Sequence, residues 1–82
     1  MPTISRFLGI VIKMFFSDHN PPHVHVIYGE YMGELNINTC EMMEGDLPPR
    51  ALSLAQEWTK AHKNALLEMW ETKKITKLPP LE

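Results

Sequence analysis

The chain has 82 residues, of which 44% are hydrophobic and 22% are charged. This length accommodates one small domain, and the hydrophobic content is too high for a disordered chain. The formal net charge of −2 lacks the basic excess that is common in proteins that bind nucleic acids without sequence preference, so only a local basic patch would serve that purpose.

Three features of the sequence predict a cytoplasmic protein. The longest apolar runs, residues 7–12 and 14–16, are separated by Lys13 and are much shorter than a membrane-spanning helix. The N-terminal residues do not have the pattern of a secretory signal. The single cysteine, Cys40, cannot form an internal disulfide, which fits a reducing compartment.

The first half of the chain has the alternating apolar pattern of β-strands. Gly9 and the pair Gly29-Glu30 fit tight hairpin turns between neighbouring strands. Both faces of the second strand are mostly apolar, so this strand is expected to be central or covered. The expected strands are residues 3–7, 10–16, 24–28 and 31–38, with a short fifth strand at residues 41–44.

The second half of the chain predicts one long helix, from about Pro49 to about Thr72. Apolar side chains recur there every three or four residues, and no glycine or proline interrupts them. A bend is allowed near Thr59, because threonine is a weaker helix former. The apolar stripe consists of Leu52, Ala55, Trp58, His62, Leu66 and Met69 or Trp70.

These elements predict an α+β fold for residues 1–72, which we expect to form a single domain. A small, mostly antiparallel sheet of four to five strands would be covered on one face by one long C-terminal amphipathic helix. Residues 73–82 are a C-terminal tail, in which Ile75 and Leu78 are apolar enough to dock. This tail either adds a strand to a sheet edge or stays loose.

Three of the four histidines lie within seven residues, beginning with His19 in the stretch Asp-His-Asn-Pro-Pro-His-Val-His-Val at residues 18–26. The double proline favours a turn that leads into a strand. Because His23 and His25 are two residues apart, their side chains project from one face of that strand, and the two valines project from the other. Both imidazoles are therefore expected to be open to a ligand.

This histidine cluster has three interpretations. In the first, two imidazoles cleave RNA through its own 2′-hydroxyl: one takes the proton from the 2′-oxygen, and the other protonates the leaving 5′-oxygen. In the second, the pair binds zinc or nickel together with Asp18 or His19. Only His23 and His25 are convincing ligands, however, so we expect no tightly held metal and no cofactor. In the third, the histidines are half-exposed strand residues that tie the turn to backbone carbonyls.

The RNA-cleavage interpretation defines a set of candidate site residues. The catalytic candidates are His23, His25, His19 and Arg6, and the substrate-binding candidates are Asp18, Arg50, Lys13 and Tyr28. Arg6 or Arg50 would stabilise the charged phosphorane. Arg6 alternatively pairs with Asp18 or a glutamate, because an arginine on a largely apolar strand face is costly unless it is paired. Tyr28 alternatively packs across its hairpin.

Three stretches of the sequence carry a resemblance to a known family: MPTISRFLGIVI at residues 1–12, FSDHNPPHVHV at residues 16–26, and LPPRAL at residues 47–52 with Glu57-Trp58 downstream. They resemble a bacterial family of small domains of unknown function, DUF4160. The resemblance extends to about Trp70, and the tail beyond it is shorter than is usual in the family. It implies a stand-alone cytoplasmic domain, often encoded beside another small protein, and hence a two-protein module for which a toxin–antitoxin role has been proposed.

Two classes of function follow, and the sequence does not decide whether the chain is an enzyme. The first is the toxin component of a bacterial toxin–antitoxin pair, acting as a metal-independent ribonuclease through the histidine cluster. The second is a noncatalytic module that binds the product of a neighbouring gene. In both, the expected partner is a small cognate protein. RNA is a further partner in the first class, a second copy of the chain is a candidate partner at the free sheet edges, and no membrane partner is expected.

Overall fold

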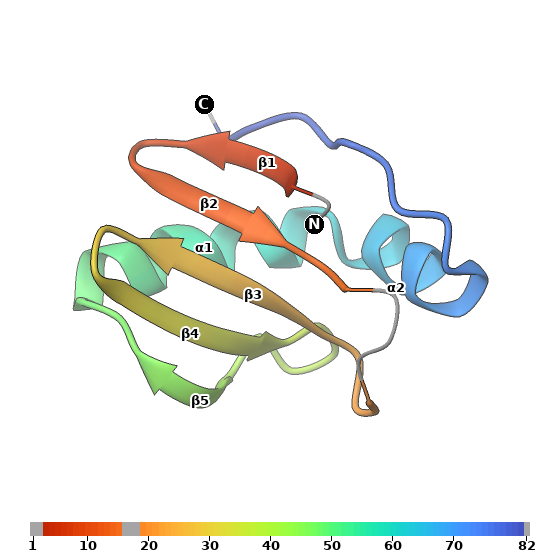
Figure 1. Cartoon of the computed structure of the whole chain (residues 1–82), viewed down its shortest axis with the longest axis horizontal. Helices are drawn as coiled ribbons and strands as arrows, with labels where there is room; N and C mark the ends of the chain where they lie inside the picture. The colour runs from red at the N-terminus through yellow and green to blue at the C-terminus, as the bar shows by residue number, and fades with distance from the viewer. Residues whose placement is uncertain (1–2, 16–18, 82) are drawn as a thin grey trace.

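Five antiparallel strands form one sheet, in which each strand lies beside the next one in the chain (Figure 1). The computed structural model describes residues 3–15 and 19–81. The strands are β1 (Thr3–Phe7), β2 (Ile10–Lys13), β3 (His23–Tyr28), β4 (Tyr31–Asn36) and β5 (Met42–Asp46). The predicted antiparallel sheet is thus confirmed, including its fifth strand.

Two strands end earlier than the alternating pattern predicts. β2 ends at Lys13, and the last residue of its predicted range, position 16, lies outside the described residues. β4 ends at Asn36 because the side chain of this residue accepts hydrogen bonds from the backbone amides of Asn38 and Thr39, at 2.8 and 3.1 Å. Such a turn competes with the strand for the backbone groups, so the chain leaves the sheet there.

Two helices, not one, follow the sheet: α1 (Pro49–Ala61) and α2 (Lys63–Thr72). The prediction of a single long helix is therefore wrong, although its outer limits are correct. The break lies at His62, whose backbone has φ −109° and ψ 19°. A straight helix over residues 49–72 would be about 36 Å long at about 1.5 Å per residue, which exceeds the longest dimension of the molecule, 31 Å. The break keeps both apolar helix faces against the sheet.

The hydrophobic core lies between the sheet and the two helices; in Figure 1, α1 lies behind the strands and α2 lies to their right. Trp58 is fully buried and stacks on Phe7, with ring centroids 5.9 Å apart. Its indole Nε1–H donates a hydrogen bond to the carbonyl oxygen of Pro79, at 2.9 Å. Of the predicted stripe, the residues Ala55, Trp58, Leu66, Met69 and Trp70 are buried, while Leu52 and His62 are half-buried.

The C-terminal tail returns from α2 to the outer edge of β1 (Figure 1). Lys73, with φ 62°, ends α2 in a left-handed conformation. Further on, the amide of Leu78 donates to the carbonyl oxygen of Ile4 at 2.9 Å, and the side chain of Leu78 packs against the core. The described part of the tail therefore docks without becoming a strand. None of the described helices is long and apolar enough to cross a membrane.

Candidate functional site

The histidine strand β3 separates two kinds of side chain, as the sequence predicts. Val24 and Val26 are fully buried in the core. His25 and Ile27 alternate with them and lie on the opposite face of the sheet, where both are half-buried. We call this face, which no described helix or strand covers, the open face.

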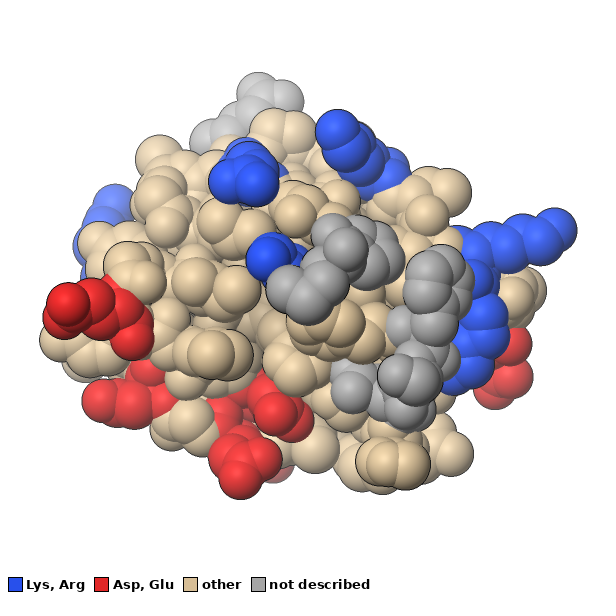
Figure 2. All heavy atoms as spheres, viewed as in Figure 1, with Lys and Arg blue, Asp and Glu red and all other residues tan. Residues whose placement is uncertain are grey.

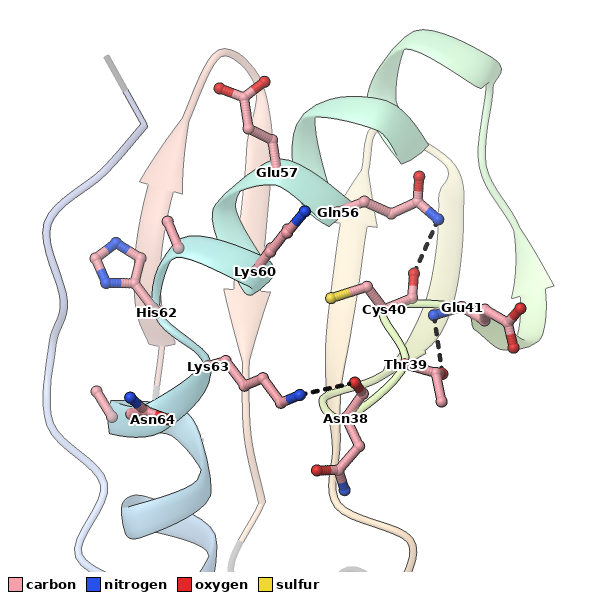
Figure 3. A pocket seen from close by; sticks show the side chains of 12 residues that line it. Asn38, Thr39, Cys40, Glu41, Gln56, Glu57, Lys60, His62, Lys63 and Asn64 are labelled. Carbon is pink, nitrogen blue, oxygen red and sulfur yellow. Dashed lines mark hydrogen bonds between the residues drawn. The ribbon is translucent and has the colours of Figure 1, made fainter.

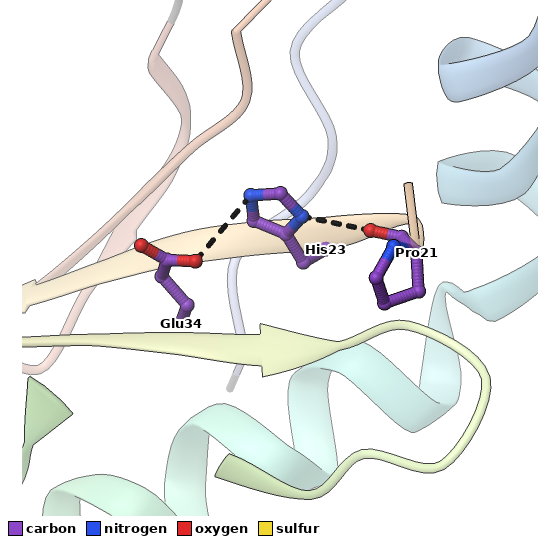
Figure 4. A network of polar contacts seen from close by, with 3 residues as sticks. All are labelled: Pro21, His23 and Glu34. Atoms are coloured by element: carbon purple, nitrogen blue, oxygen red, sulfur yellow. Dashed lines mark hydrogen bonds and ion pairs between the residues drawn. The ribbon is translucent and has the colours of Figure 1, made fainter. Parts of the chain in front are cut away.

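His23 is buried, with only 6% of its surface exposed, so the expectation that both imidazoles are open is wrong for this residue. Its Nδ1 lies 2.8 Å from the carbonyl oxygen of Pro21, and its Nε2 lies 3.6 Å from a carboxylate oxygen of Glu34 (Figure 4). Its ring also packs against Trp70, with centroids 5.3 Å apart. His23 thus ties the proline turn to the strand through a backbone carbonyl, but it is buried, not half-exposed as the structural interpretation expects.

The Pro21 carbonyl also fixes the chemistry of the His23 ring. A carbonyl oxygen only accepts hydrogen bonds, so Nδ1 must carry the hydrogen. Nε2 then has a lone pair in the neutral imidazole and a hydrogen in the imidazolium. Only the imidazolium is attracted to the Glu34 carboxylate, and both ring nitrogens are directed at protein groups. This arrangement makes His23 a poor candidate for a base that acts on a substrate.

His25 is the more accessible of the two imidazoles. Its ring lies 5.2 Å from the ring of His23 and meets the edge of Phe15 at 4.5 Å, measured between centroids. In the strand register, His25 lies directly between Lys13 on β2 and Glu34 on β4. One cation and one carboxylate therefore flank it on the open face.

Cross-strand pairing arranges the open face in two rows. The first row, from β1 to β5, is Arg6, Val11, Ile27, Met32 and Asp46. The second row, from β2 to β5, is Lys13, His25, Glu34 and Glu44. Each row begins with a cation and ends with a carboxylate. Figure 2 shows this face, with basic side chains over β1 and β2 and acidic side chains over β4 and β5.

Not all predicted site residues come together. Arg6 lies on the open face, but it belongs to the row that contains Ile27 and not to the row that contains His25. Tyr28 lies on the other face, in register with Ile10, and its ring passes close to Gly9, where an added Cβ would lie 3.3 Å from it.

The other three candidates are Arg50, His19 and Asp18. Arg50 is exposed in the first turn of α1, behind the sheet. His19 is exposed and has none of the described ring contacts that join His23 and His25. Asp18 lies outside the described residues.

A hollow lies away from the histidine strand β3, at the break between the helices, where His62 is among its lining residues (Figure 3). Its volume is about 1040 Å³, and it opens between the turn after β4 and the α1–α2 junction. Lys63 spans it and donates to the carbonyl oxygen of Asn38 at 3.1 Å, and Gln56 donates to that of Cys40 at 2.8 Å. The sequence did not predict this hollow, because it depends on the helix break at His62.

The described residues contain no group of three or more histidine, cysteine, aspartate or glutamate side chains placed to hold a metal ion. The sequence pattern alone did not predict the open face as a continuous surface. The signal was present in the period-two alternation of each strand, but Met32 and Glu34 join His25 only through the pairing register.

Comparisons with known proteins identify a family. No curated protein and no solved structure gives a significant match to the chain. The model of one family, described as a domain of unknown function (DUF4160), matches residues 9–71. This range runs from the first hairpin turn almost to the end of α2 and includes the histidine strand. The chain therefore belongs to the DUF4160 family.

Proposed function

We propose that the chain is a noncatalytic binding module whose open face takes up another protein. The observation that carries the proposal is the apolar row Val11, Ile27 and Met32 across the middle of that face. Val11 and Ile27 are half-buried, and Met32 is 57% exposed. An exposed apolar strip with charged groups at its rim has the composition of a protein-binding surface.

The partner expected for such a module is the small protein encoded beside it, as the family resemblance implies. The charges of the open face set the orientation of this partner. Its acidic groups would lie over β1 and β2, where Arg6 and Lys13 project, and its basic groups would lie over β4 and β5. The apolar row would supply most of the affinity, and the charges would supply the register.

A charge placed in the apolar row tests this proposal. Met32→Glu should weaken binding of the purified neighbouring gene product by about 10-fold or more, because a carboxylate would have to be desolvated in the interface. Met43→Glu is the matched control, since Met43 is also exposed on the sheet but belongs to neither row. Titration calorimetry measures the affinity of each variant for the neighbouring gene product. Equal affinities for parent and Met32→Glu, with both variants folded, would refute the proposal.

A second function, RNA cleavage by a toxin component, is favoured by the position of His25. This imidazole lies beside His23 and across from Lys13. In this function His25 would act either as the base that takes the proton from the 2′-oxygen or as the acid that protonates the leaving 5′-oxygen. Lys13 would stabilise the negative charge on the phosphorane. The neighbouring Glu34 and Glu44 oppose it, because they repel phosphate groups. Since His23 already faces Pro21 and Glu34, a second proton-transfer group is harder to assign.

Expression in the host tests the RNA-cleavage candidate. If it is correct, expression of the chain alone inhibits growth, co-expression of the neighbouring gene restores it, and His25→Asn abolishes the inhibition. His62→Asn, at the helix junction, is the control and should leave the inhibition intact. Unimpaired growth of cells that express the folded parent chain alone would exclude this function.

A further inference from the structure

We infer that a second copy of the chain occupies the open face in the purified protein, with the two sheets packed face to face about a two-fold axis parallel to β3. This inference rests on the proposed function, because it names an occupant for the same face. Its basis is the way charge is distributed along the two rows.

The charge pattern is self-complementary under that axis. A two-fold axis that lies between two sheets and runs parallel to β3 places β1 over the partner's β5, and β2 over the partner's β4. Positions along the strands stay level. Arg6 then faces the second copy's Asp46, and Lys13 faces the second copy's Glu34, because each pair belongs to one row. Symmetry repeats both ion pairs on the other side of the axis.

The other in-plane axis gives the opposite result. A two-fold axis perpendicular to the strands would place β1 over β1 and β5 over β5. Arg6 would then approach another cationic edge, and Asp46 another acidic one. Like charges brought together in an interface are strongly unfavourable. The distribution of charge therefore selects the axis parallel to β3.

The middle of the face suits the same arrangement. Ile27 lies on the central strand and meets its own counterpart near the axis, while Val11 faces the second copy's Met32. Two sheets that pack in this way lie about 10 Å apart with their strands within about 30° of each other. The half-buried apolar row fills that space, the Lys13–Glu34 pairs lie on the inner strands β2 and β4, and the Arg6–Asp46 pairs lie at both rims.

A charge swap at the two rims tests the inference. Arg6 and Asp46 are both exposed, so reversing them should leave the fold intact. Arg6→Glu and Asp46→Lys should each raise the dimer dissociation constant by about 10-fold, because each sets like charges against each other. Arg6→Glu combined with Asp46→Lys in one chain inverts the gradient and restores complementarity, so dimerisation should return to the parental value. Sedimentation equilibrium of the full chain at several concentrations measures all four proteins.

Lys74→Glu is the matched control. It changes the net charge as much as Arg6→Glu does, but it lies in the exposed tail, away from both rows. It should leave the dissociation constant unchanged. Single reversals with no effect, a double variant as weak as the single ones, or a parent chain that stays monomeric would each overturn the inference.

The inference and the proposed function can fail separately. If the parent chain is monomeric but Met32→Glu weakens binding of the neighbouring gene product, the dimer inference is wrong and the proposed protein-binding face stands. If the dimer dissociation constant responds to the charge swap as expected, but the neighbouring gene product binds parent and Met32→Glu equally, the dimer inference stands. The proposal that the cognate partner binds this face is then wrong.

Discussion

Replacement of Trp58 is the sharpest test of how the helices meet the sheet. Trp58 is fully buried, stacks on Phe7 and donates a hydrogen bond to the Pro79 carbonyl. Trp58→Ala removes the largest of the fully buried side chains and should cost about 3–5 kcal/mol. A chain of 82 residues has a total stability of about 4–12 kcal/mol at about 0.05–0.15 kcal/mol per residue. The variant should therefore be close to unfolding.

Urea denaturation followed by far-UV circular dichroism measures this loss, since the parent fluorescence comes from both Trp58 and Trp70. With an m-value of about 1.5 kcal/mol/M, the midpoint should fall by about 2–3 M. Trp58→Phe keeps a ring near Phe7 but loses the hydrogen bond to Pro79, so it should cost less, about 1–3 kcal/mol. Glu57→Ala, at an exposed position of the same helix, should change stability by less than about 0.5 kcal/mol. A parental midpoint for Trp58→Ala would mean that another face of α1 points inward.

Three further predictions follow from the site and the turns. His23→Ala should cost about 1–3 kcal/mol in urea, because it removes a buried ring and its hydrogen bond to the Pro21 carbonyl oxygen, whereas half-buried His25→Ala should cost less than about 1 kcal/mol; equal losses would contradict the different burial of the two rings. Gly45→Ala should melt well below Gly29→Ala, since both have positive φ but only at Gly45 would a Cβ lie 2.2 Å from a backbone oxygen. Elemental analysis of untagged protein should find well under one equivalent of zinc, nickel or manganese, and a stoichiometric metal lost in His25→Ala would reverse this expectation.

Local rules predicted the strands and the outer limits of the helical region. Gly9 and Gly29 lie in hairpin turns, and Pro49 is the first residue of α1. These features depend on neighbours in the sequence, so a pattern of a few residues is enough to find them. The break at His62 lies between two helices that both contribute residues to the core against the sheet, so it depends on contacts between distant parts of the chain.

The candidate site was predicted only in part for the same reason. Alternation along β3 correctly placed His23 and His25 on the face opposite the valines. It did not reveal that Trp70 packs against His23, because Trp70 is far away in the sequence. It also did not place Glu34 beside His25, since that neighbour is set by the register between β3 and β4.

The central claim is that the open face binds protein, and methyl NMR tests it most directly. Ile27 and Met32 report on the apolar row, and the exposed Ala61 at the end of α1 reports on the opposite side of the molecule. On addition of the purified neighbouring gene product, the methyl signals of Ile27 and Met32 should shift or broaden while that of Ala61 stays unchanged. A complex that moves the Ala61 signal and leaves Ile27 and Met32 unchanged would contradict the claim.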